Sequence, residues 1–151
     1  MKPSAVMFLA TGGNVGRIPV ASGTFGSLVG LPIVYVLSLT DWTIAALLTV
    51  ALILFSVWVA HGAEQILEAK DPGCIVIDEI AGMCVTMLAI PLTVTTGAAG
   101  FFLFRLFDVI KPPPARQMEQ YLSGGWGVVM DDVVAGIMAN IVLRIGLMLF
   151  A

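Results

Sequence analysis

The chain has 151 residues, of which 59% are hydrophobic and 11% are charged, and its formal net charge is −3. Soluble domains average about 25% charged residues, so this composition, with a mean hydropathy of +1.02, excludes an ordinary soluble domain and predicts an integral membrane protein. The Lys and Arg residues are scattered, which excludes a nucleic-acid partner because nucleic-acid surfaces need a clustered basic face. The length predicts one domain over residues 1–151.

The first half of the chain contains two apolar blocks. Residues 28–39 follow a glycine-rich segment, 23–27, and are too few for a normal membrane span. Residues 43–60 form a run of 18 residues without a charge, close to the roughly 20 residues that cross about 30 Å of hydrocarbon. This second block is the clearest predicted transmembrane helix, and a polar loop is predicted after it, over residues 61–73.

Three further apolar blocks follow, at residues 80–90, 98–104 and 133–150. A turn is predicted at 91–97, where Pro, Thr and Gly cluster, and the prolines at 112–114 cannot continue a helix. These blocks predict an all-α fold, a compact polytopic helical membrane protein with about four to five membrane-embedded helices, some of them short or re-entrant.

The basic residues predict the orientation. If the apolar blocks alternate in direction across the membrane, the turns at 40–42 and 91–97 lie on one side and six of the basic residues lie on the opposite side. Those two turns carry no Lys or Arg. By the positive-inside rule the side with the basic residues is cytoplasmic, and the acidic residues of the second half lie on it too. The six residues are Lys2, Arg17, Lys70, Arg105, Lys111 and Arg116.

Two acidic pairs, Asp78-Glu79 and Asp131-Asp132, stand directly before apolar runs. Carboxylates at membrane depth are costly and usually face a polar cavity, a metal or a partner charge. Mg²⁺ takes oxygen ligands and often bridges to substrate phosphate, whereas zinc favours His and Cys. The chain has one His, and its two Cys residues fit no zinc spacing and are interpreted as free thiols. The pairs therefore predict Mg²⁺ and phosphate chemistry.

The glycine-rich segment is a candidate anion site. Thr24 and Ser27 place hydroxyl groups at the start of a predicted helix, where free backbone N–H groups and the helix dipole favour an anion. Arg105 and Lys111 are further candidates for binding phosphate oxygens. The alternative for the segment is a tight turn or close helix packing.

Other residues have simpler alternatives. Taken alone, Asp78, Asp131 or Asp132 is more often a helix N-cap than a ligand. His61 and Glu64, which are three residues apart, are secondary candidate ligands with a solvated helix end as the alternative. Arg144 is expected to extend toward the far membrane interface.

Four motifs in order resemble those of the phosphatidylglycerophosphatase A family, and the resemblance covers nearly the whole chain. It implies a Mg²⁺-dependent phosphatase that converts the lipid phosphatidylglycerophosphate to phosphatidylglycerol in the bacterial inner membrane. The motifs are the segment 19–27, residues 71–82 with Asp78 and Glu79, residues 104–112 with Arg105, Asp108 and Lys111, and residues 124–136 with Asp131 and Asp132.

On this interpretation the carboxylates have distinct roles. Asp78, Glu79, Asp131 and Asp132 would supply the Mg²⁺ ligands, and Asp108 would orient or deprotonate a water molecule. Arg105 and Lys111 would neutralise the phosphomonoester, and Thr24 and Ser27 would hold it at the helix start. An aspartyl-phosphate intermediate is the alternative to direct attack by water.

Two other classes of function stay open. A CDP-alcohol-type headgroup transferase also uses acidic clusters and Mg²⁺, but its signature run of residues is absent from this sequence. A small ion transporter would place charges through the membrane depth and often carries an inverted repeat, and the sequence contains no such repeat. Release of phosphate from lipid without a nucleotide would separate the phosphatase from both.

Overall fold

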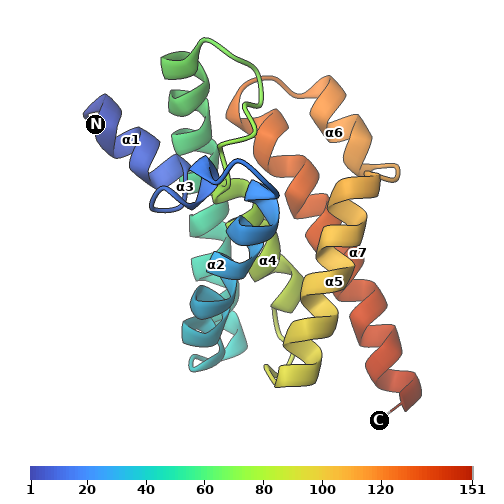
Figure 1. The fold of residues 1–151 in the computed structure, drawn as a ribbon. Helices are drawn as coiled ribbons and strands as arrows, with labels where there is room; N and C mark the ends of the chain where they lie inside the picture. Colours follow the sequence, from blue (N-terminus) through green and yellow to red (C-terminus); the bar gives the residue numbers. More distant parts are fainter. Residues whose placement is uncertain (151) are drawn as a thin grey trace.

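The computed structural model describes residues 1–150, with the side chains of Glu119 and Phe150 outside this description. The described chain contains helices and no strands, which confirms the predicted all-α class (Figure 1). The elements in order are α1 (Pro3–Ala10), the short 3-10 helix η1 (Val15–Arg17), α2 (Ser22–Ser38), α3 (Trp42–Leu67), α4 (Ile77–Met87), α5 (Val94–Ile110), α6 (Ala115–Tyr121) and α7 (Gly125–Phe150).

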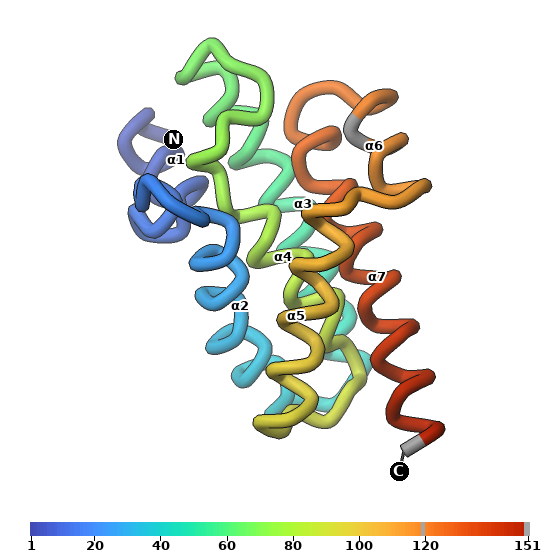
Figure 2. Tube along the Cα trace, turned by 45° about the vertical axis from the view of Figure 1, so that its right-hand side comes forward, coloured from blue at the N-terminus to red at the C-terminus, as the bar shows by residue number. Residues whose placement is uncertain are grey.

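Helix α4 is the centre of the fold. It packs against α2, α3, α5 and α7, and Figure 2 shows it between α2 and α5. Every residue of α4 except Glu79 is buried. A helix that is buried on all sides must have small or apolar residues all round, and the run after Glu79 meets this requirement. The polar groups at its two ends therefore need partners from the surrounding helices.

Glycines bring the backbones of α4 and α7 close together. A Cβ atom built at Gly136 of α7 would lie only 2.6 Å from the carbonyl oxygen of Gly82 in α4. A Cβ atom built at Gly82 would lie 2.6 Å from the ring of Phe104 and 3.0 Å from the carbonyl oxygen of Asp132. Because neither position has room for a side chain, α7 crosses α4 closely one turn from the acidic residues of both helices.

Two of the described helices are long and apolar enough to cross a membrane, α3 and residues 125–149 of α7. Both extend beyond the predicted apolar blocks, since α3 continues through the predicted loop to Leu67 and α7 begins before the acidic pair. The shorter α2, α4 and α5 lie beside them. Exposed apolar side chains cover the outer faces, among them Leu47, Phe102 and Ile141. The predicted four to five embedded helices remain a prediction.

The loops separate into two ends of the bundle. Figure 1 shows the α3–α4 loop and α6 at one end, and the α2–α3 and α4–α5 turns at the opposite end. Helix α5 ends at Ile110, directly before the residues Lys111 and Pro112, as predicted. The α3–α4 loop and the end of α5 therefore approach the start of α4 from the same end.

Arg144 binds the C-terminal end of α4. Its guanidinium donates hydrogen bonds to the carbonyl oxygens of Leu88 (2.9 Å) and Ala89 (3.1 Å) and to Asn140 Oδ1 (2.8 Å). Asn140 in turn donates to the carbonyl oxygens of Thr86 (2.8 Å) and Leu88 (3.0 Å). These bonds satisfy carbonyl groups that the end of α4 would otherwise leave unpaired, and the extension of Arg144 toward the far interface remains a prediction.

Candidate active site

A polar cavity of about 390 Å³ lies at the end of the bundle where α4 begins. The first turn of α2, the α3–α4 loop, the end of α5 and α7 surround it. Six acidic and two basic side chains line the cavity, so an anionic ligand there requires additional positive charge. The lining residues are Ala21, Ser22, Gly23, Asp71, Gly73, Ile75, Asp78, Glu79, Arg105, Asp108, Val109, Lys111, Asp131 and Asp132.

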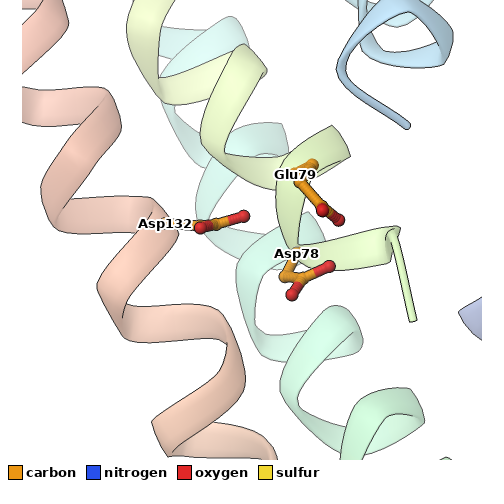
Figure 3. Close-up of side chains that lie close together, drawn as sticks. All are labelled: Asp78, Glu79 and Asp132. Carbon is orange, nitrogen blue, oxygen red and sulfur yellow. The ribbon is translucent and has the colours of Figure 1, made fainter. Parts of the chain in front are cut away.

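Three carboxylates converge on one point of this cavity. Asp78 and Glu79 lie in the first turn of α4, and Asp132 reaches them from α7 (Figure 3). One oxygen of each residue lies within 4.8 Å of one oxygen of each of the other two. The three carboxylates could therefore hold a metal ion between them, and oxygen atoms are the ligands that Mg²⁺ and Ca²⁺ take.

Four buried carboxylate oxygens of the described side chains have no hydrogen-bond partner. Most buried polar groups in proteins are paired, and leaving an ionised carboxylate buried and unpaired costs several kcal/mol. The four residues that carry these unpaired oxygens all line this cavity, and a positively charged ligand there would stabilise their carboxylates. The oxygens are Asp78 Oδ1, Glu79 Oε2, Asp131 Oδ1 and Asp132 Oδ2.

Burial also changes the protonation of the pair in α4, a helix outside the two candidate spans. Burial, followed by the neighbouring charges of Glu79 and Asp132, raises the pKa of Asp78 well above its ordinary value. Burial also raises the pKa of Glu79, and the side-chain hydrogen bond with Asp78 partly offsets this rise. The ionised forms are therefore costly in the protein alone, and a bound cation would favour them.

The two basic residues of the cavity are each held by an acid. Arg105 forms an ion pair with Asp108, one turn further along α5. Lys111, which ends α5 in the left-handed conformation, donates to Asp131 Oδ2 at 2.6 Å. Asp131 therefore pairs with a lysine and does not belong to the group of three carboxylates, which consists of Asp78, Glu79 and Asp132. Both cations face the same cavity as that group.

The donors fit a hard divalent cation. All ligand atoms in the group of three are carboxylate oxygens, as Mg²⁺ prefers. Neither cysteine lines the cavity: Cys74 is partly exposed in the α3–α4 loop and Cys84 is buried in α4, and both are free thiols as expected. The structure thus brings together a site that could hold a metal ion.

Comparison with known proteins assigns the chain to a family. Residues 8–147 match the family model described as Phosphatidylglycerophosphatase A. The chain belongs to the phosphatidylglycerophosphatase A family. This confirms the predicted resemblance over most of the sequence.

Relatives of similar length agree with this assignment. The chain is 36% identical to the Phosphatidylglycerophosphatase A of Escherichia coli (strain K12) over 140 residues, covering 91% of this chain and 81% of that protein. It is 37% identical to the protein of that name from Haemophilus influenzae, covering 91% and 86%. It is also 36% identical to a Bacteroides thetaiotaomicron protein named Putative phosphatidylinositol-3-phosphatase, covering 92% and 91%. No solved structure matches the chain.

Within this member of the phosphatidylglycerophosphatase A family, the cavity collects seven of the nine predicted site residues. They are Asp78, Glu79, Arg105, Asp108, Lys111, Asp131 and Asp132. The other two do not line it. Ser27 is fully buried and its hydroxyl donates to the carbonyl oxygen of Gly23 at 2.8 Å, while Thr24 is half-buried one residue beyond the lining. Their binding role remains a prediction.

The N-cap alternative for the acids was wrong. The N-cap residue of α4 is Val76, and Asp78 lies inside the helix. Asp131 and Asp132 lie roughly two turns into α7, since that helix begins at Gly125 and has about 3.6 residues per turn. Capping therefore explains none of these acids.

The secondary candidates lie outside the cavity. His61 approaches Gln65 on α3, with 3.1 Å between the His61 Nε2 and Gln65 Nε2 atoms. Glu64 accepts a hydrogen bond from the backbone N–H of Asp71 at 2.9 Å and so fixes the α3–α4 loop. Sequence reasoning named no role for Asp71 or Ser22, and included Gly23 only as part of the glycine-rich segment, although all three line the cavity. Their presence in the motifs at 19–27 and 71–82 was the available signal.

Proposed function

We propose that this chain hydrolyses the phosphomonoester of phosphatidylglycerophosphate, releasing phosphatidylglycerol and inorganic phosphate. Membership of the family makes it a phosphoric monoester hydrolase. The observation that carries the proposal is the group of unmet carboxylate oxygens beside two cationic side chains in one cavity. Such a cavity has ligands for a cation on one side and donors for phosphate oxygens on the other.

Mg²⁺ is the cation that we propose for Asp78, Glu79 and Asp132. These three residues would hold the ion, which would supply Lewis-acid polarisation of the phosphoryl group and of the attacking water. Asp131 contributes its unmet Oδ1 to the same cavity, while its Oδ2 holds Lys111 in place. Asp131 thus connects the metal-binding acids to a cation that faces the substrate.

Arg105 and Lys111 neutralise the phosphomonoester. A phosphate dianion cannot enter a cavity with an excess of acids unless its charge is balanced, and charge-assisted hydrogen bonds from guanidinium and ammonium groups are the strong ones. The start of α2 adds the backbone N–H groups of Ser22 and Gly23, since the first residues of a helix have no intrahelical acceptor. Thr24 lies in this first turn and Ser27 in the next one.

Asp108 is the proposed general base. Its ion pair with Arg105 fixes the carboxylate beside the residue that binds phosphate. From there Asp108 accepts a proton from the attacking water as the water oxygen bonds to phosphorus. The P–O bond to the lipid headgroup breaks, and the headgroup oxygen takes up a proton from solvent to give the alcohol of phosphatidylglycerol. An aspartyl phosphate formed on one of the acids is the alternative route. Acid quenching during turnover of substrate that carries ³²P in its phosphomonoester separates the two routes, since only an aspartyl phosphate leaves the label on the protein.

The test is release of inorganic phosphate from phosphatidylglycerophosphate in detergent micelles by the purified protein, without nucleotide. Release that requires Mg²⁺ and stops in excess EDTA supports the proposal. Release that persists in EDTA would support the proposed phosphatase activity and refute its proposed dependence on Mg²⁺. No release by folded, monodisperse protein would refute the proposal and return the headgroup transferase and the transporter to consideration.

A second lipid belongs in the same assay. The Bacteroides relative is named for phosphatidylinositol 3-phosphate, another phosphomonoester on a lipid headgroup, and its identity to this chain equals that of the Escherichia coli relative. We expect the higher kcat/KM with phosphatidylglycerophosphate. A preference for the inositol lipid would replace the proposed substrate while leaving the proposed chemistry in place.

We place the cavity at the cytoplasmic face of the bacterial inner membrane. The α3–α4 loop, which carries Lys70, lies at the cavity end of the bundle, and the positive-inside rule assigns such an end to the cytoplasm. Cys74 of this loop is partly exposed and Cys84 is buried. A membrane-impermeant maleimide should therefore label Cys74 in inverted vesicles and leave it unlabelled in intact cells. The reverse pattern would place the cavity outside.

A further inference from the structure

Three buried glycines of α2 lie on one face of the helix, at Gly23, Gly26 and Gly30. A Cβ atom at Gly26 would lie 2.7 Å from Val76 Cβ, and one at Gly30 would lie 2.8 Å from Met83 Cβ. At these two positions the missing side chain lets α2 pack closely against apolar side chains at the start and middle of α4. Close helix packing explains both.

Gly23 differs from the other two because its neighbours are charged. A Cβ atom there would lie 2.4 Å from Glu79 Oε1 and 3.0 and 3.1 Å from the two terminal nitrogens, Nη1 and Nη2, of Arg105. Real Cβ atoms essentially never lie within 3.0 Å of another heavy atom, so the Glu79 oxygen would have to move, and the two Arg105 nitrogens would lie at the close limit of ordinary contacts. An alanine at this position would therefore move the Glu79 carboxylate, the Arg105 guanidinium or the start of α2.

Backbone conformation does not explain a glycine at this position. Among the described glycines, the left-handed conformation occurs at Gly12, Gly13 and Gly124, whereas Gly23 lies inside helix α2. Alanine is the better helix former, so local helix stability favours a side chain here. The space taken by Glu79 and Arg105 is what opposes one.

We infer that Gly23 is a positioning residue that sets the distance between the metal-binding carboxylate of Glu79 and the phosphate-binding guanidinium of Arg105. This inference rests on the proposed function, which gives those two residues their roles. Sites of this kind must keep their groups within about 0.5 Å of the productive geometry, and a displacement of about 1 Å can cost roughly a hundredfold in rate. The absence of a side chain keeps both groups in reach of one substrate.

The test compares three alanine variants in detergent. Gly23→Ala should weaken binding of Mn²⁺, used as the probe cation and measured by titration calorimetry without substrate, by at least tenfold, and should lower kcat. Gly30→Ala meets an equally close but apolar neighbour, so it should lower the thermal midpoint and leave Mn²⁺ affinity unchanged. Gly146→Ala, where no atom lies within 4 Å of the added Cβ, should change neither.

A double-mutant cycle sharpens the test. Glu79→Asp shortens the side chain and withdraws the carboxylate from residue 23. Mn²⁺ affinity in Gly23→Ala/Glu79→Asp should therefore fall by less than the product of the two single effects. If Gly23→Ala does not fold, the same relief of crowding predicts that the double variant does. Strictly multiplicative effects, or a double variant that still fails to fold, would overturn the inference.

The outcomes separate the inference from the proposed function. If the wild-type protein binds Mn²⁺ and releases phosphate while Gly23→Ala matches it in both, the positioning role is refuted and the proposed function stands. If the wild-type protein does neither, the proposed function fails and the inference fails with it.

Discussion

The two ends of helix α4 are built in opposite ways. At its C-terminal end, the side chains of Asn140 and Arg144 donate to backbone carbonyl groups at 2.8–3.1 Å, so the groups that a helix end leaves unpaired are satisfied from within the chain. At its N-terminal end, Asp78 and Glu79 each keep a buried carboxylate oxygen with no hydrogen-bond partner.

The difference indicates what each end is for. Helix α7 supplies the partners at one end and a third acid, Asp132, at the other, so the same helix stabilises one end and adds charge to the other. A fold selected for stability alone would pair or remove these acids. The N-terminal end is thus arranged for a ligand that completes it, and the C-terminal end for rigidity.

Removing the charge of Asp132 should have the largest effect on activity. Asp132→Asn should lower kcat about a thousandfold, which corresponds to about 4 kcal/mol of transition-state stabilisation. In EDTA the same variant should melt at a higher temperature than the wild type, because one unpaired buried charge is gone. Phosphate release and thermal melting in detergent measure the two effects. Near-normal kcat would remove Asp132 from the site.

Adding a cation should stabilise the N-terminal end of α4. Mg²⁺ at about a hundredfold excess over its Kd should stabilise the folded protein by about 2.7 kcal/mol. The stabilisation should be lost in Asp132→Asn and retained in Arg144→Met, because only the former alters the cation ligands. Melting curves with and without Mg²⁺ measure it. An equal response of both variants would show that the cation binds elsewhere.

Removing the Arg144 guanidinium at the C-terminal end of α4 should affect stability rather than chemistry. Arg144→Met leaves the carbonyl groups of Leu88 and Ala89 without these donors and should cost about 2 kcal/mol of stability. We expect kcat within about twofold of the wild type at a temperature where the variant is folded. Arg116→Met, at an exposed position on α6, is the matched control and should melt as the wild type does. A large loss of kcat in Arg144→Met would contradict the proposed division between the two ends.

The smallest effect on stability is expected at Asp41, the N-cap of α3, at the same end of the bundle as the C-terminal end of α4. Hydrogen bonds from the Thr43 hydroxyl and from the backbone N–H groups of Thr43 and Ile44 lower the pKa of Asp41. Because the folded pKa is lowered, the contribution to stability is present above the ordinary pKa of Asp and is lost as the pH falls through the lowered value. Asp41→Ala should slightly lower the melting temperature at pH 7, and this difference should vanish in acid. A difference that persists at all pH values would assign the effect to something other than ionisation.

Much of the site could be predicted because charge is rare in this chain. Asp78, Glu79 and Asp132 stand out in an apolar sequence, and the structure brings them together. The pairing of Asp131 with Lys111 could not be predicted in the same way. It depends on how α7 is rotated against α5, because adjacent residues of a helix point about 100° apart, and that rotation is set by packing.

Helix boundaries were harder to predict than helices. Apolar runs located α3 and α7, but α3 continues seven residues past Ala60, to Leu67, and α7 begins at Gly125. Hydrophobicity reports burial, and a helix can continue where it becomes polar. Gly125 is also a case of close packing, since a Cβ atom there would lie 2.0 Å from the carbonyl oxygen of Val57. A glycine that suggests a loop in the sequence is here the first residue of a helix.

Helix α7 gives the group of three its last member, and this has a consequence during biosynthesis. Asp78 and Glu79 are translated more than 50 residues before Asp132, and α7 is the last of the described helices to leave the ribosome. A nascent chain that has formed only α1 to α5 contains two of the three acids and cannot form the group. The group of three therefore assembles only after α7 has docked on α4, so a shorter translation product lacks it.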